Sequence, residues 1–134
     1  MTPFGRRLRA LRAERGLTLK AMAADLGVSP AYLSALEHGH RGRPNRRFVH
    51  RVCQSLAIIW DEAEELQRLA DLSHPRVTVD TAGLTPEATE LANRLAEQIH
   101  ELPHDTVERM LQELRRRAGE REPELHSGTT SRAS

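Results

Sequence analysis

The sequence predicts an all-α protein in two parts, and three observations lead to this prediction. Apolar residues recur at helical spacing along most of the chain up to residue 117. Short breaks containing Gly, Pro or Ser divide this pattern into segments of one helix each. Residues 1–51 hold eleven Arg and Lys against three Asp and Glu, whereas residues 52–134 hold nine against sixteen. We therefore expect a basic helical domain followed by an acidic helical region.

The spacing predicts five short helices in a first domain, residues 1–72. Ser29 and Asn45 are good N-caps for the third and fourth of these helices, and Gly27 and Gly39 are good terminators for the second and third. The expected helices cover residues 3–15, 19–26, 30–38, 45–56 and 61–72, with Trp60 at the start of the last.

Residues 16–44 carry the most informative pattern in the chain. Two short helices meet at a tight turn at Gly27, and a basic loop follows the second of them. That second helix has an apolar face at Leu33 and Leu36, and its other face holds small or hydrogen-bonding side chains. A short helix of this kind beside several arginines suits the major groove of DNA. We therefore expect double-stranded DNA as a partner.

The second part of the chain begins with an extended linker, residues 73–83, whose strand-prone run 77–79 could pair with its twin in a dimer. Residues 84–118 predict a helical hairpin too small to bury its apolar stripe alone, so we expect it to form a homodimer. Residues 119–134 are polar and predict a disordered tail. The expected dimer contacts are Leu91, Leu95, Ile99, Leu102, Met110, Leu111 and Leu114.

Composition and motifs argue against several other classes of protein. Cys53 is the only cysteine, so no internal disulfide is possible, and no apolar run approaches the roughly 18 residues that span a bilayer. No phosphate-binding glycine loop, nucleophile elbow or HExxH motif occurs. We expect a cytoplasmic, bacterial or phage protein that is not an enzyme and uses no cofactor.

A metal site is the main alternative for four side chains with ligand chemistry: His38, His40, His50 and Cys53. His50 and Cys53 are three residues apart on one expected helix and could share an ion. Cys53 also lies on the apolar stripe of that helix, which favours a small core residue. We expect no metal.

From Phe4 to Leu56 the chain resembles the Cro/C1-type (Xre-like) helix-turn-helix regulators, which have the λ-repressor-like fold. The resemblance implies that the five helices form that fold, and that a homodimer binds a pseudo-palindromic operator as a transcriptional regulator, most simply a repressor. The matching residues are Arg12, Arg15-Gly16-Leu17, Ala23, Leu26-Gly27-Val28-Ser29, the run from Tyr32 to Gly39, and Arg43-Pro44.

In the resembling family the third helix contacts base edges, and the loop after it contacts phosphates. Some members of the family have glutamines at three positions where this chain has Leu19, Pro30 and Ala31. These side chains, unlike glutamine, cannot form bidentate hydrogen bonds to bases. The implied base contacts are Pro30, Ala31, Tyr32, Ser34 and Ala35, and the implied phosphate contacts are Arg41, Arg43, Asn45 and Arg46.

The resemblance also implies a largely buried ion pair between Arg12 and Glu37. The acidic half of the chain could contact RNA polymerase or another regulator. An alternative function is an antitoxin or other interaction module, in which the acidic C-terminal helices bind a partner protein and DNA binding serves autoregulation.

Overall fold

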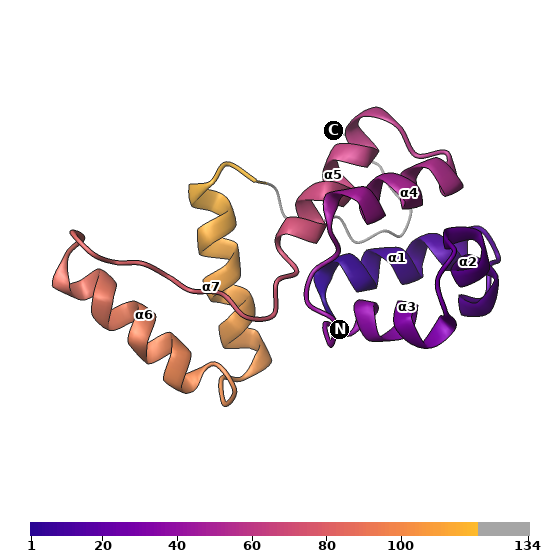
Figure 1. Ribbon diagram of the computed structural model, residues 1–134. Coiled ribbons are helices and arrows are strands. Elements are labelled where there is room, and N and C mark those ends of the chain that lie inside the picture. Colours follow the sequence, from indigo (N-terminus) through magenta and orange to yellow (C-terminus); the bar gives the residue numbers. More distant parts are fainter. Residues whose placement is uncertain (121–134) are drawn as a thin grey trace. The chain divides into compact units, whose positions relative to one another are not determined.

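The computed structural model describes residues 1–120, over which the protein is helical apart from turns and extended connections. Seven helices occur in this described part, and no strand does (Figure 1). The chain divides into one compact unit, Met1–Thr78, and a second that begins at Val79. The predicted all-α fold is confirmed. Most of the predicted disordered tail, residues 121–134, lies outside the described residues.

The first unit contains α1 (Pro3–Glu14), α2 (Leu19–Leu26), α3 (Pro30–Glu37), α4 (Arg46–Leu56) and α5 (Trp60–Asp71). In this unit α1 packs against α3 and α5, α2 packs against α3 and α4, and α4 packs against α5 (Figure 1). These contacts bury one continuous core. Its members are Phe4, Leu8, Leu11, Met22, Ala23, Leu26, Leu33, Leu36, Phe48, Val49, Val52, Cys53, Leu56, Ile58, Leu66 and Ala70.

Side-chain caps determine where α3 and α4 begin. The Ser29 hydroxyl accepts the backbone N–H of Tyr32 at 3.0 Å, and the Asn45 side-chain oxygen accepts that of Phe48 at 2.8 Å. Each bond satisfies one of the amides that a helix start leaves without a partner. Both predicted caps are confirmed.

The end of α3 differs by one position from the prediction. We expected Gly39 as its C-cap, but α3 ends at Glu37 with His38 as the cap, and Gly39 follows with a φ of 83°. The N–H of His40 donates to the carbonyl of Ala35 at 2.9 Å, which is the bond of a Schellman motif. That motif needs its left-handed residue one place beyond the cap, where glycine is tolerated best.

Ala57 occupies the left-handed region after α4, with a φ of 57°, although it carries a Cβ. We expect Ala57→Gly to raise the free energy of unfolding by about 0.5–1 kcal/mol, because relief of left-handed strain exceeds the entropy that glycine adds to the unfolded chain. Ala57 is exposed, so little packing is lost. Urea unfolding of the full chain measures the change.

Ala24→Gly is the matched control, since Ala24 is exposed inside α2. It should lower the free energy of unfolding by about 1 kcal/mol. Losses of equal size at both positions would contradict the left-handed strain at Ala57.

Ser73 ties the start of α1 to the end of α5. Its hydroxyl oxygen accepts the backbone N–H of Phe4 at 2.9 Å and its hydroxyl donates to the carbonyl of Leu69 at 2.6 Å. The side chain is buried, with 2% of the residue exposed. Ser73 belongs to the segment that sequence analysis assigns to the linker, so the sequence pattern did not indicate this contact.

The second unit contains α6 (Pro86–Gln98) and α7 (His104–Arg117). The predicted apolar stripe up to Leu102 implied a longer first helix, but α6 ends at Gln98 and residues 99–102 form a turn. Pro103 prevents the helix from continuing through Leu102, because a proline disfavours helical backbone in the residue before it, but nothing in the structure explains the end at Gln98. The described segment 77–79 is exposed and forms no strand.

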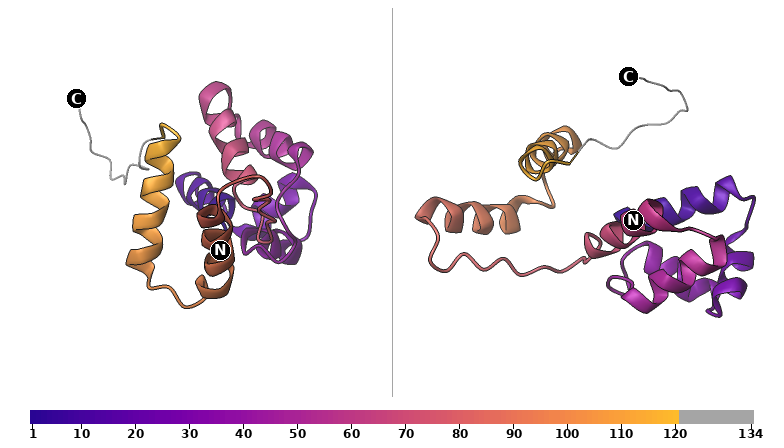
Figure 2. Two further views of the ribbon diagram at one scale, coloured as in Figure 1. Left: turned by 90° about the vertical axis from the view of Figure 1, so that its left-hand side faces the viewer. Right: turned by 90° about the horizontal axis from the view of Figure 1, so that it is seen from above.

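Neither α6 nor α7 buries a residue. The two helices have little mutual contact and are steeply inclined to each other (orange and yellow in Figures 1 and 2). Their large apolar side chains are exposed instead of covered: Leu91, Leu95, Ile99, Met110, Leu111 and Leu114. The second unit therefore has no hydrophobic core of its own within the described residues.

Candidate nucleic-acid interface

One face of α3 is available to a ligand, and the opposite face anchors the helix. Leu33 and Leu36 are buried in the core, whereas Pro30, Ala31 and Tyr32 are exposed. The other two predicted base contacts, Ser34 and Ala35, are half-buried. Proline, alanine and tyrosine at an exposed first turn make a small surface that can approach another molecule closely.

The turn between α2 and α3 sets the angle of that face. Gly27 ends α2 with a φ of 73°, and the N–H of Val28 donates to the carbonyl of Ala23 at 3.0 Å. Ala23 is fully buried between α2 and its neighbours, where a larger side chain would separate them. Arg51 of α4 donates to the carbonyl of Leu26 at 2.9 Å and so fixes the end of α2.

The loop between α3 and α4 carries the predicted phosphate contacts. The Arg41 guanidinium lies over the Tyr32 ring, 5.6 Å from its centroid. Arg43 is exposed and one guanidinium nitrogen lies 4.0 Å from a carboxylate oxygen of Asp71. Asn45 uses its side-chain oxygen to cap α4, which leaves its amide N–H donors for a phosphate. Arg46 is exposed at the first position of α4.

Arg12 of α1 and Glu37 of α3 form a buried ion pair, in which a guanidinium N–H donates to the Glu37 carboxylate. The side chain of Glu37 is 3% exposed and that of Arg12 is 13% exposed. Burial raises the pKa of the Glu37 carboxyl above its ordinary value, against the opposing effect of Arg12. The carboxylate therefore points into the fold and away from the face that carries Tyr32.

Similarity to known proteins agrees with this geometry. A family model described as a helix-turn-helix domain matches residues 3–66. Residues 3–66 of this chain are thus similar to a helix-turn-helix domain. The segment is 41% identical over 61 residues to the HTH-type transcriptional repressor RghR of Bacillus subtilis, covering 46% of this chain and 45% of that protein.

A second relative is the uncharacterized HTH-type transcriptional regulator RghRB of Bacillus subtilis, 36% identical over 61 residues, covering 46% of this chain and 44% of that protein. The match thus spans just under half the length of each relative. No solved structure matches the chain. No helix among the described residues has the length and apolar character needed to cross a bilayer.

The histidines and cysteine of the first unit do not form a metal cluster. No group of three His, Cys, Asp or Glu side chains in the described residues is arranged to hold an ion. Cys53 is buried, and burial raises the pKa of its thiol. The Nδ1 atom of His38 lies 2.9 Å from the carbonyl oxygen of Ser34, so this nitrogen carries a proton and donates to the backbone.

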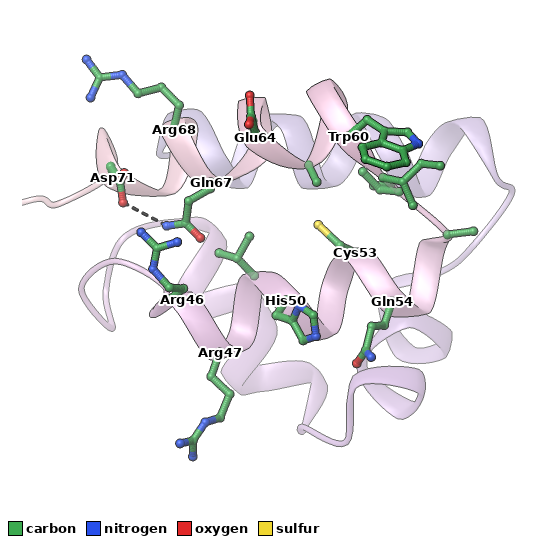
Figure 3. Close-up of a pocket in the computed structure, with 15 residues that line it drawn as sticks. Arg46, Arg47, His50, Cys53, Gln54, Trp60, Glu64, Gln67, Arg68 and Asp71 are labelled. Carbon is green, nitrogen blue, oxygen red and sulfur yellow. Dashed lines mark hydrogen bonds between the residues drawn. The ribbon is translucent and has the colours of Figure 1, made fainter.

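An apolar surface between α4 and α5 of the first unit was not predicted from the sequence. Figure 3 shows this open groove, of about 1300 Å³, with Trp60 near one end and Arg46 and Asp71 near the other. Trp60 is 81% exposed and Ile59 is 62% exposed. The only signal in the sequence is the apolar run at residues 58–60, which also suits burial.

Proposed function

We propose that this protein is a sequence-specific DNA-binding transcriptional regulator that acts as a homodimer. The observation that carries the proposal is the exposed first turn of α3 beside the arginine-bearing loop, within a helix-turn-helix domain. Such domains place their second helix in the major groove of DNA. Repression is the proposed direction, because the relative RghR is named a repressor. RNA polymerase or another regulator is a further proposed contact of the acidic half.

We propose two sets of DNA contacts, one to base edges and one to phosphates. The exposed α3 residues face base edges, where they discriminate between sequences. The loop residues and the first turn of α4 face phosphates, where they fix position and supply affinity that falls with salt. The proposed base contacts are Pro30, Ala31, Tyr32, Ser34 and Ala35, and the proposed phosphate contacts are Arg43, Asn45 and Arg46, with Arg41 considered below.

The second unit supports a homodimer as the binding form. Isolated helices as short as α6 and α7 are marginal in water, and both leave their apolar stripes uncovered. Charge agrees with a second copy as the cover at one end of α7. The helix α6 carries three Glu and one Arg, whereas the last turn of α7 holds three arginines, of which Arg116 and Arg117 pair with Glu113. The α6 stripe can therefore meet the last turn of α7 of the other copy with complementary charge. Two copies would place two α3 helices on a pseudo-palindromic operator.

The test is selection of bound sequences from a random double-stranded DNA library by the full-length protein. The expected product is a motif of two inverted half-sites, with centres about one helical turn, roughly 10 base pairs, or a multiple of it apart. Retention of DNA without any enriched sequence would contradict sequence-specific regulation. An enriched single half-site would contradict the dimer and leave DNA recognition intact.

Arg43→Ala should weaken binding to every DNA sequence by a similar factor, because a phosphate contact carries no base information. The slope of log K against log[salt] should fall by about 1. Fluorescence anisotropy with the selected duplex and an unrelated duplex, over a range of salt concentrations, measures both changes.

Asp71→Asn is the matched control for Arg43→Ala. It removes the carboxylate that lies 4.0 Å from Arg43 and keeps the guanidinium, so binding should not weaken. A change of sequence preference in Arg43→Ala would contradict the phosphate assignment.

Leu91→Glu should convert the dimer to a monomer, because it places a charge in the α6 stripe that the second copy covers. Asn93→Glu adds the same charge on another face of α6 and should remain dimeric. Analytical ultracentrifugation of the full chain at several concentrations distinguishes the two variants. A wild-type chain that stays monomeric would contradict the homodimer and favour the interaction module whose helices bind a different protein.

A further inference from the structure

The guanidinium of Arg41 and the ring of Tyr32 form a cation–π contact on the exposed side of α3. The guanidinium carbon of Arg41 lies over the Tyr32 ring at 5.6 Å from its centroid, and both residues are exposed. The Tyr32 backbone is fixed, because its N–H donates to the hydroxyl of Ser29 at 3.0 Å. A cation over an aromatic ring is attracted by the negative face of that ring. The pair therefore holds a guanidinium beside the first turn of α3.

A guanidinium held above a ring can still present hydrogen-bond donors to another molecule, since its N–H groups lie in its plane and point outward from its edges. Two parallel N–H groups on one edge match the O6 and N7 acceptors of guanine in the major groove. The contact with Tyr32 also restricts the rotamers of Arg41 before any DNA is bound. Less side-chain freedom is then lost when the hydrogen bonds form.

The other exposed side chains of this first turn lack such donors. Pro30 and Ala31 can make apolar contacts but no side-chain hydrogen bonds. Arg43, two residues after Arg41, is placed differently, because its guanidinium lies near Asp71 of α5. Arg41 is thus the arginine of this loop whose guanidinium lies over the ring of a proposed base-contacting residue.

We infer that Arg41, held over the Tyr32 ring, recognises a guanine in the major groove of each half-site. Toward this guanine Tyr32 is a positioning residue that acts through Arg41, beside the base contact of its own proposed above. This inference rests on the proposed DNA-binding function and refines it, and it assigns Arg41 to a base where the family resemblance implies a phosphate.

The test uses selection from a random duplex library by the full-length protein and its variants. The wild-type motif should contain one constant guanine in each half-site. Arg41→Ala should reduce the preference for that guanine over the other bases by roughly 5- to 150-fold while the preferences at other positions persist. Arg41→Lys keeps the charge but replaces the planar pair of donors with one ammonium group, so it should reduce the preference less than Arg41→Ala does and retain the salt dependence of the wild type.

Chemistry on the DNA identifies the contact atom. Replacing the constant guanine by 7-deazaguanine removes the N7 acceptor and should weaken wild-type binding but not binding by Arg41→Ala. Tyr32→Phe keeps the ring and should keep the guanine preference, whereas Tyr32→Ala should reduce it. Arg43→Ala is the matched loop control and should keep the preference with lower affinity for all sequences.

The outcomes separate this inference from the proposed function. Failure of the wild type to enrich any sequence would overturn both. An enriched motif that Arg41→Ala and Arg41→Lys bind with the wild-type base preferences, without a 7-deazaguanine effect, would overturn the guanine assignment alone. Arg41 would then be a phosphate contact.

Discussion

Glu37→Ala is expected to lower the free energy of unfolding of the N-terminal unit by about 3–5 kcal/mol, the usual loss when one partner of a buried ion pair is removed. The variant leaves the Arg12 guanidinium, 13% exposed, without the carboxylate that accepts its hydrogen bond. Urea unfolding of wild type and variant at neutral pH measures the difference. A loss below about 1 kcal/mol would contradict an energetically coupled pair.

A double variant separates the cost of the unpaired charge from the cost of lost packing. Replacing both partners, as Arg12→Met with Glu37→Leu, removes both charges and keeps similar volumes. Buried pairs replaced in this way are often neutral or stabilising. The double variant should therefore recover most of the stability that Glu37→Ala loses. If it does not, the side chains contribute mainly through shape.

Gly5→Ala is expected to lower the free energy of unfolding by about 1–3 kcal/mol or more, the usual cost of forcing an atom into a packed site. A Cβ built on Gly5 would lie 2.1 Å from the backbone oxygen of Glu37 and 2.7 Å from its carbonyl carbon. These backbone atoms cannot rotate away, so α1 and α3 would have to separate. Thermal and urea unfolding report the loss.

Ala13→Gly calibrates this result, because Ala13 is exposed in the same helix. At Ala13 the alanine form should have the higher free energy of unfolding, by about 1 kcal/mol, because alanine has the higher helix propensity. At Gly5 the glycine form should instead have the higher free energy of unfolding. A Gly5→Ala protein more stable than wild type would show that α1 does not approach the Glu37 backbone so closely.

Local patterns predicted the fold well because they depend on near neighbours in sequence. Helical spacing of apolar residues placed the core faces, and the caps Ser29 and Asn45 bond amides only three residues away. The Arg12–Glu37 pair followed from the family resemblance. The end of α6 was missed because the apolar spacing continues past Gln98, although the backbone does not.

The contacts that sequence analysis missed join residues far apart in the chain. From the sequence, Gly5 is only a residue of low helix propensity, whereas in the structure the backbone of Glu37 occupies the place where its Cβ would lie. Ser73 reads as a linker residue, but its partner Phe4 is 69 positions away. The cation–π contact of Arg41 with Tyr32 depends on the conformation of the loop between α3 and α4. No spacing rule within one helix contains this information.

The attachment of α3 has a consequence for how this protein can evolve. Thr2, Gly5 and Arg12 of the N-terminal segment all meet α3 at Glu37, and the remaining anchors are core leucines. Pro30, Ala31 and Tyr32 take no part in these attachments through their side chains. Substitutions at these three positions can therefore accumulate with little cost in stability. Under the proposed function, duplicated copies can therefore change the base-contacting turn of α3 and keep the same folded scaffold.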